Sequence, residues 1–206
     1  MKTAKPIDKS MIKRVNSHKV GWIFSPIDFI DLGSRSAIDK ALSRMTATHL
    51  IRRIARGLYD APQHHPVIGS LHPSIDNIAH ALAGRDGARL QPTGAYAANL
   101  LGLSEQVPAK VVFLTDGRSK RVRLGNLDIV LKQTSTRNMT TAGTISGLVI
   151  QALRYLGKSH VDSNTEKRLA SKLSTADKRQ LVKDLRYAPA WIGVIIKRIN
   201  TEFAHG

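Results

Sequence analysis

The sequence predicts an α+β protein of two domains, and three observations lead to this fold class. The chain has 206 residues, of which 42% are hydrophobic and 23% charged, so it can form two modest domains with buried cores. Stretches with helical spacing of apolar residues alternate with short β-prone runs through the first two thirds of the sequence. From Thr144 to the end the pattern is helical, with breaks at Gly157 and Pro189.

A change in composition divides the chain. Residues 61–74, APQHHPVIGSLHPS, contain three prolines, one glycine and three histidines. Proline is incompatible with a helix interior and with a central strand, so this stretch is typical of a linker. We therefore expect a first domain over residues 1–62, a linker over 63–74 and a mixed α+β domain over 75–206.

The first domain begins with a helix, a short strand and a second helix. Apolar residues at helical spacing predict an amphipathic helix from about Ser10, which Gly21 ends. An apolar run over residues 22–24 follows. Ser25 and Pro26 then provide an N-cap and a first-turn proline for the second helix.

A third helix follows, which Ser34 caps. Its buried face is defined by apolar residues at three- and four-residue spacing, among them Ile38 and Leu42. At about 100° per residue, the opposite side carries Ser36, Lys40 and Ser43, flanked by Arg44. The solvent side of this helix therefore combines small residues with cations.

The first domain ends in a hairpin. Residues 50–54 and 58–59 are β-prone runs joined across Arg56-Gly57, where glycine suits a positive φ. The order helix, strand, helix, helix, hairpin is that of a winged helix-turn-helix. We therefore predict an N-terminal winged helix-turn-helix followed by a mixed domain with a small antiparallel meander and C-terminal helices.

This arrangement suggests contact with duplex DNA. A helix whose exposed side has small residues and cations can lie deep in a major groove, and a basic hairpin can contact phosphates or the adjacent minor groove. The alternative is that these cations form a solvated face of a small subdomain used for protein contact. The residues predicted to contact DNA are Ser36, Lys40, Ser43, Arg44, Arg52, Arg53 and Arg56.

The second domain is predicted to contain helices and a meander. Helices are expected over residues 73–83 and 92–101, and strands over 111–115, 121–124 and 127–132, joined by turns at Asp116-Gly117 and Gly125-Asn126. The middle strand and the turn before it present cations outward. These cations form either a surface for nucleic acid or an acidic partner or the solvated side of a short meander: Arg118, Lys120, Arg121 and Arg123.

The net charge and the residue types that the sequence lacks restrict its possible partners and catalytic activities. The formal net charge of +17 favours polyanionic partners, and the absence of cysteine excludes disulfides and thiol nucleophiles. Gly157-Lys158-Ser159 lacks the first glycine and the preceding strand of a phosphate-binding loop. The paired carboxylates of two-metal phosphoryl transfer are also missing, so we expect no enzymatic activity.

A metal site and a membrane segment are not expected either. Histidines 64, 65, 72 and 80 lie near Asp76, but three of these histidines fall in the proline-rich linker, whereas zinc needs ligands on rigid elements. We therefore expect no metal and no cofactor. The N-terminus has basic residues without an apolar stretch, which predicts a cytoplasmic protein without a membrane partner.

Residues 21–62 resemble the N-terminal winged-helix domain of the AbiE-type abortive-infection antitoxins. The resemblance is closest over Phe24–Phe29, Ala41–Arg44 and Arg56–Tyr59. Residues 92–117 resemble the opening of the C-terminal domain of the same family, and Ala188–Trp191 also fits that family. The order of these segments covers nearly the whole chain and is more specific than any one of them.

The resemblance implies the antitoxin of a type IV toxin-antitoxin pair. Such antitoxins repress their operon by binding inverted repeats in promoter DNA, and they neutralise a co-encoded nucleotidyltransferase-fold toxin without needing a stable complex. Two alternatives remain open from the sequence. One is an RNA-binding accessory protein that uses the predicted meander as its platform, against which the low aromatic content of 5% speaks. The other is a module that sequesters an acidic protein partner, without operator recognition.

Overall fold

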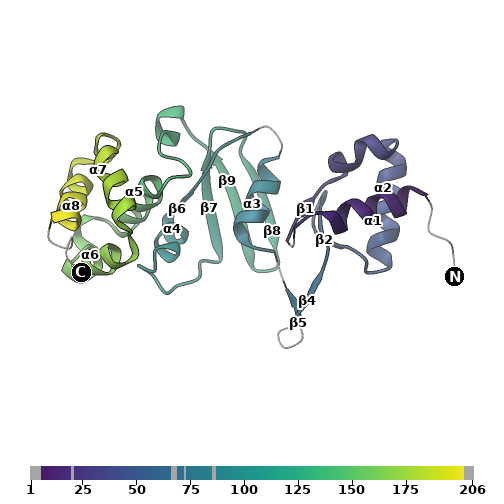
Figure 1. Cartoon of the computed structure of the whole chain (residues 1–206), viewed down its shortest axis with the longest axis horizontal. Helices are drawn as coiled ribbons and strands as arrows, with labels where there is room; N and C mark the ends of the chain where they lie inside the picture. Colours follow the sequence, from purple (N-terminus) through teal and green to yellow (C-terminus); the bar gives the residue numbers. More distant parts are fainter. Residues whose placement is uncertain (1–5, 20, 66–68, 72, 85–86, 202–206) are drawn as a thin grey trace. The chain divides into compact units, whose positions relative to one another are not determined.

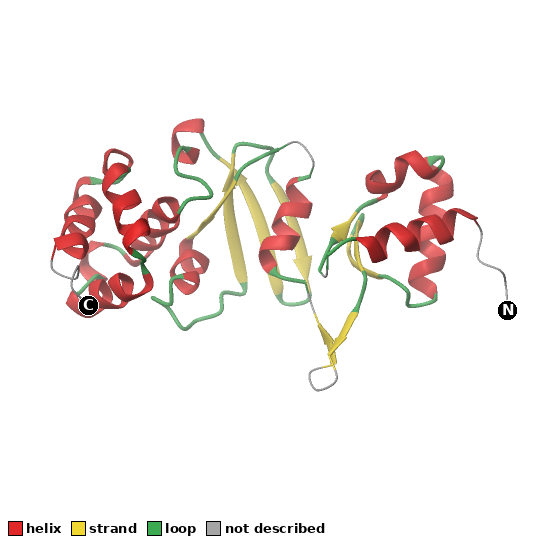
Figure 2. Ribbon diagram, in the orientation of Figure 1, coloured by secondary structure: helices red, strands yellow, loops and turns green. Residues whose placement is uncertain are grey.

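The computed structural model describes residues 6–19, 21–65, 69–71, 73–84 and 87–201 (Figure 1). The chain divides into two compact units, residues 1–84 and 85–206. Helices and strands occur in both units, and the last part of the chain is helical (Figure 2). The predicted α+β fold class with C-terminal helices is therefore confirmed.

Unit 1 begins with the predicted order of elements. The short strands form one antiparallel sheet in the order β1-β3-β2, so the last strand of the hairpin lies between the other two. Ser34 caps the third helical element by accepting a hydrogen bond from the backbone N–H of Ala37 at 3.3 Å. These elements are α1 (Pro6–Ser17), β1 (Ile23–Phe24), the 3₁₀ helix η1 (Pro26–Leu32), α2 (Arg35–Ala47), β2 (Arg52–Ala55) and β3 (Leu58–Asp60).

Aromatic and aliphatic side chains form the core of unit 1. Phe24 and Phe29 lie edge to face with ring centroids 5.5 Å apart, and Ile38 and Leu42 pack in the same cluster with no exposed area. Met11 of α1 belongs to this cluster as well. The predicted buried face of α2 therefore holds the helix against α1, β1 and η1.

The predicted linker has more structure than its prolines suggest. Strands β4 (Gln63–His65) and β5 (Gly69–Leu71) pair in an antiparallel hairpin. The next helix, α3 (Ile75–Ala83), belongs to unit 1, and Asn77 Nδ2 donates a hydrogen bond to the Gly21 carbonyl at 3.1 Å. The boundary between the units therefore falls after Gly84, later than the composition predicts.

The sheet of unit 2 is not the predicted meander. Its strand order is β6-β7-β9-β8, and β7 pairs with β9 in parallel, whereas β8 and β9 form the predicted antiparallel hairpin. The apolar run of β7 suits an interior strand, in which Val111 and Phe113 are buried and Val112 and Leu114 between them are half-buried. The strands are β6 (Leu90–Thr93), β7 (Lys110–Thr115), β8 (Lys120–Leu124) and β9 (Leu127–Gln133).

Helices complete unit 2. Gly157 ends the first long helix at a φ of 79°, and Ser174 caps a later helix through Asp177, as the sequence predicts. Leu153, Leu169, Leu181 and Ile196 are fully buried in one cluster between the helices. The helical elements are α4 (Gly94–Leu100), η2 (Thr136–Met139), α5 (Ile145–Leu156), η3 (Lys158–His160), α6 (Ser163–Lys172), α7 (Thr175–Lys183), η4 (Leu185–Tyr187) and α8 (Ala190–Thr201).

Over the described residues, no helix combines the length and the apolar character that crossing a bilayer requires.

Candidate nucleic-acid interface

Helix α2 presents the polar side that the sequence predicts. Ser36, Lys40 and Ser43 are exposed, while Ile38 and Leu42 on the opposite side have no exposed area. The Lys40 side chain makes no hydrogen bond or ion pair with any described residue. Its ammonium is therefore available to an anion from outside the molecule.

Arg35 is a further exposed cation of α2 that the sequence pattern does not predict as a DNA contact. It begins α2 directly after the Ser34 cap, and its Nε lies 3.0 Å from Asp39 Oδ2, one turn further along the helix. Both side chains are about half exposed, and such a pair contributes little to stability. A phosphate could thus replace Asp39, and the helix N-terminus would favour the same anion.

Arg44 has a partner inside unit 1. Its Nη2 donates to Asp8 Oδ1 at 2.6 Å and its Nε to Asp8 Oδ2 at 3.1 Å. These hydrogen bonds raise the pKa of the Arg44 guanidinium, and Asp8 itself is only 7% exposed. Arg44 therefore joins α2 to α1, and its predicted role in DNA contact remains a prediction that the ion pair does not favour.

Arg52 is likewise engaged. It lies directly opposite Asp60 in the β2–β3 pair and donates to both carboxylate oxygens, at 3.0 and 2.6 Å. A third hydrogen bond of 2.9 Å runs from Arg52 Nη2 to the carbonyl of Leu71 in β5. Asp60 is 3% exposed, so Arg52 compensates a buried negative charge. Because Arg52 already binds Asp60 and Leu71, its guanidinium is less available to a phosphate than that of an unpaired arginine.

Arg53 and Arg56 remain exposed on the hairpin. Arg53 Nε makes one long hydrogen bond of 3.4 Å to the Ala55 carbonyl, beside an irregularity in the pairing of β2. Arg56 lies in the turn next to Gly57, whose φ is 75°, and has no hydrogen bond or ion pair within the described ranges. We refer to the exposed set in unit 1 as the α2–hairpin residues: Arg35, Ser36, Lys40, Ser43, Arg53 and Arg56.

The four predicted cations of unit 2 lie on or just before β8, an edge strand. Arg121 donates to both carboxylate oxygens of Asp128, at 2.8 and 2.7 Å, and these hydrogen bonds lower the pKa of Asp128. Arg123 Nε is 3.4 Å from the Gly125 carbonyl, Arg118 is exposed and Lys120 is half-buried. The structure brings the four together along one edge, and their role as a binding surface stays a prediction.

The histidines considered for metal binding fall partly outside the described residues. His72 is not described, nor are the side chains of His64 and His65, while His80 is exposed on α3 and Asp76 is half-buried. Over the ranges that the structure covers, no group of three or more His, Asp or Glu side chains is arranged to hold a metal ion.

Comparisons with known proteins concern the family and the fold. Residues 10–181 match the protein family described as "Family of unknown function (DUF6088)". The crystal structure of the RV2827C protein from Mycobacterium tuberculosis is similar to this chain with a TM-score of 0.50 and 11% identity, over 98% of this chain and 78% of that one. At this identity the likeness concerns the fold alone. No curated protein matches the sequence.

Proposed function

The chain belongs to the DUF6088 family, and we propose that it binds duplex DNA through the α2–hairpin residues and represses transcription from its own promoter. The observation that carries this proposal is the polar side of α2. Lys40 extends from it without a described partner, between the exposed hydroxyls of Ser36 and Ser43. A helix with such small neighbours can approach base edges closely.

The arrangement of unit 1 supports the proposal. Helix, strand, helical turn, helix and hairpin follow in this order, and the sheet order β1-β3-β2 is the one that winged helix-turn-helix domains use. In such domains the helix equivalent to α2 enters the major groove and the hairpin contacts the flanking backbone. We assign Ser36 and Ser43 to base edges, and Lys40, Arg53 and Arg56 to phosphates.

The structure narrows the set of candidate contacts. Arg44 and Arg52 are held by Asp8 and Asp60, so we assign them to the scaffold of unit 1. Arg35 takes their place among the phosphate contacts, because its exposed pair with Asp39 is easily exchanged. The net charge of +17 adds long-range attraction to any polyanion, without sequence preference.

We also propose that the protein acts in the cytoplasm as the antitoxin of a type IV toxin-antitoxin pair. This part of the proposal rests on the resemblance of residues 21–62 and 92–117 to the AbiE-type antitoxins. Its partner would be a co-encoded toxin of the nucleotidyltransferase fold, countered without enzymatic activity of this chain. Coexpression with the neighbouring reading frame tests it: the proposal requires that toxicity appears without this chain and is relieved with it.

The DNA-binding proposal is tested by the salt dependence of affinity. The probe is a labelled duplex from directly upstream of the gene, titrated at several salt concentrations with the wild type and with Lys40→Ala/Arg53→Ala. Each phosphate contact contributes about −0.9 to the slope of log K against log salt. The slope of the double variant should therefore be less steep than that of the wild type by nearly two units. The affinity of the double variant for the duplex should fall as well.

A matched control removes cations that belong to unit 2. Lys183→Ala/Lys197→Ala removes two exposed charges from α7 and α8 in unit 2 and should leave the slope unchanged. Equal losses in both double variants, or an unchanged slope in Lys40→Ala/Arg53→Ala, would contradict the assignment. Tighter binding to a single-stranded RNA of the same sequence would favour the RNA-binding alternative instead.

A further inference from the structure

A cavity in unit 2 is lined by three arginines from three separate elements. Its volume is about 540 Å³, within the range of roughly 300–1,000 Å³ that small-molecule sites occupy. Arg137 comes from η2, Arg154 from α5 and Arg186 from η4, and among the described residues no Asp or Glu lines the cavity. Ile150, Gln151, Tyr187, Ala188 and Pro189 also line the cavity.

These three arginines differ from many others because none of them has an acidic partner among the described residues. Carboxylates pair with Arg14, Arg35, Arg44, Arg52, Arg89, Arg121 and Arg198. Within the described ranges, the guanidinium groups of Arg137 and Arg154 make no hydrogen bond or ion pair, and Arg186 lies over the Tyr187 ring at 4.9 Å. No carboxylate in the described part of the chain therefore pairs with the guanidinium groups that line this cavity.

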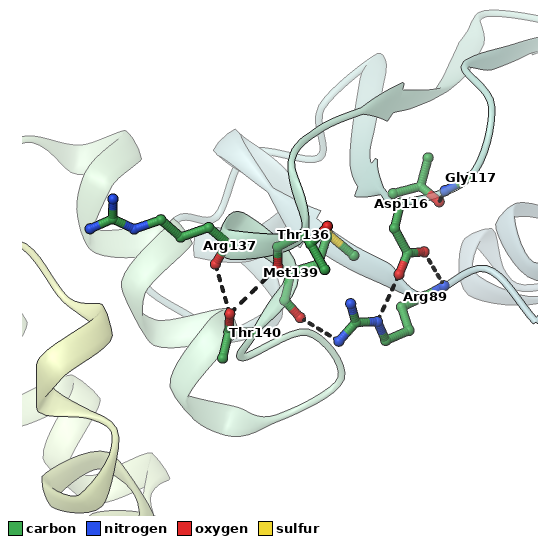
Figure 3. Close-up of polar contacts among 8 residues, drawn as sticks. Arg89, Asp116, Gly117, Thr136, Arg137, Met139 and Thr140 are labelled. Carbon is green, nitrogen blue, oxygen red and sulfur yellow. Dashed lines mark hydrogen bonds and ion pairs between the residues drawn. The ribbon is translucent and has the colours of Figure 1, made fainter.

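Contacts behind the cavity hold η2 in place. The Arg89 backbone N–H and Nε each donate to Asp116 at 2.8 Å, and Arg89 Nη1 donates to the Met139 carbonyl at 3.0 Å (Figure 3). Met139 is fully buried beneath this turn. Figure 3 shows the Arg137 side chain extending away from Arg89 and Asp116. Arg89, which directly precedes β6, therefore holds the backbone of η2 that presents Arg137.

Contacts within unit 2 also position the lining residues from α5 and η4. Arg154 and Gln151 lie one turn apart on α5, and Gln151 Oε1 accepts a hydrogen bond of 2.8 Å from the Thr93 hydroxyl. Arg186 stacks on Tyr187, which orients its guanidinium. Ile150, Ala188 and Pro189 add an apolar wall. The cavity thus combines guanidinium groups with a small apolar surface.

We propose that this cavity binds the phosphate of a nucleotide, either free in solution or at the end of a nucleic-acid strand. Guanidinium groups pair with phosphate oxygens in bidentate geometry, and three of them without a competing carboxylate suit a multiply charged oxyanion. The volume exceeds that of phosphate alone, and the apolar wall accommodates the attached nucleoside. The residues that line this site all belong to unit 2, whereas the α2–hairpin residues belong to unit 1.

Calorimetric titration of the full chain tests the proposal with matched probes. Adenosine monophosphate should bind and adenosine should not, because the two differ only in the phosphate. Arg154→Gln should weaken binding about tenfold, the expected loss of one charge-assisted hydrogen bond. Arg179→Gln makes the same change of charge on α7, outside the cavity, and should leave the affinity unchanged.

The source of the phosphate and the independence of the site are tested with two further comparisons. If short single strands with a terminal phosphate bind at least tenfold more tightly than both the unphosphorylated strands and the mononucleotide, the ligand is a strand end; if the mononucleotide binds as well as they do, it is a free nucleotide. Lys40→Ala/Arg53→Ala should bind adenosine monophosphate like the wild type, so DNA binding can fail while this inference holds. No phosphate-dependent binding of either probe, equal affinity for citrate, or equal weakening by Arg179→Gln would overturn the proposal.

Discussion

Arg52 and Arg53 are adjacent in sequence but have different surroundings. Arg52 compensates the buried Asp60, whereas Arg53 is exposed. Loss of one partner leaves the other charge buried without compensation, so Arg52→Ala should lower the free energy of unfolding by about 3 kcal/mol. Arg53→Ala should change it by less than about 0.5 kcal/mol. Urea unfolding followed by circular dichroism measures the free energy of unfolding of both variants. Equal losses in the two would show that Arg52 does not compensate the buried charge of Asp60.

The ion pair between Asp116 and Arg89 can be tested through the pH dependence of stability. Hydrogen bonds from the Arg89 side chain and backbone hold the pKa of the Asp116 carboxyl below the ordinary value of 3.8. Since the pKa is lower in the folded state, the stabilisation by this carboxylate is present above pH 3.8 and is lost as the pH falls through the depressed folded value. Asp116→Asn cannot titrate, so its melting temperature should lie furthest below that of the wild type near neutral pH. If the difference in melting temperature between Asp116→Asn and the wild type does not become smaller at acidic pH, the stabilising ion pair is contradicted.

At the scale of elements, replacing a helical glycine by alanine should have opposite effects on stability at two positions of unit 2. A Cβ on Gly147 of α5 would lie 2.2 Å from both Gln91 Oε1 and the Thr141 carbonyl, so Gly147→Ala should destabilise unit 2 by about 1–3 kcal/mol. On Gly193 of α8 the nearest atom would be Leu185 Cδ2 at 3.7 Å, an ordinary contact. Gly193→Ala should therefore stabilise the protein by about 0.5–1 kcal/mol through helix propensity. Thermal unfolding of the two variants distinguishes them directly.

The elements that local chemistry defines could be predicted from sequence. The Ser34 cap and the apolar spacing of Ile38 and Leu42 predict α2, and Arg56-Gly57 predicts the hairpin. Along α2 the exposed positions Ser36, Lys40 and Ser43 follow from the same spacing. These predictions succeed because each depends on contacts within a few residues.

The partners of distant residues could not be predicted in the same way. Asp8 and Arg44 are 36 residues apart, and their ion pair forms only when α1 packs on α2. The turn at Asp116-Gly117 indicates a reversal of the chain but does not specify that β9 will pair with β7. The cavity arginines come from η2, α5 and η4, so no local motif unites Arg137, Arg154 and Arg186.

At the scale of the whole molecule, each unit has its own hydrophobic core. Phe24, Phe29 and Leu42 belong to the core of unit 1, whereas Leu153 and Leu169 belong to that of unit 2. Proteins with separate cores often unfold in more than one step. Differential scanning calorimetry should therefore resolve two transitions, of which Arg52→Ala lowers one and Gly147→Ala the other. A single transition that shifts with either substitution would show that the units unfold together.

The two outer strands of the unit 2 sheet have a consequence for the behaviour of the protein at high concentration. Pro92 in β6 lacks a backbone N–H, and β8 carries Arg121 and Arg123 on its outward face. Both features discourage a strand of another molecule from adding to the sheet, one by removing a donor and the other by repulsion between like charges. The sheet thereby resists growth into fibrils, and the cations of β8 contribute to this protection whether or not they also meet a ligand.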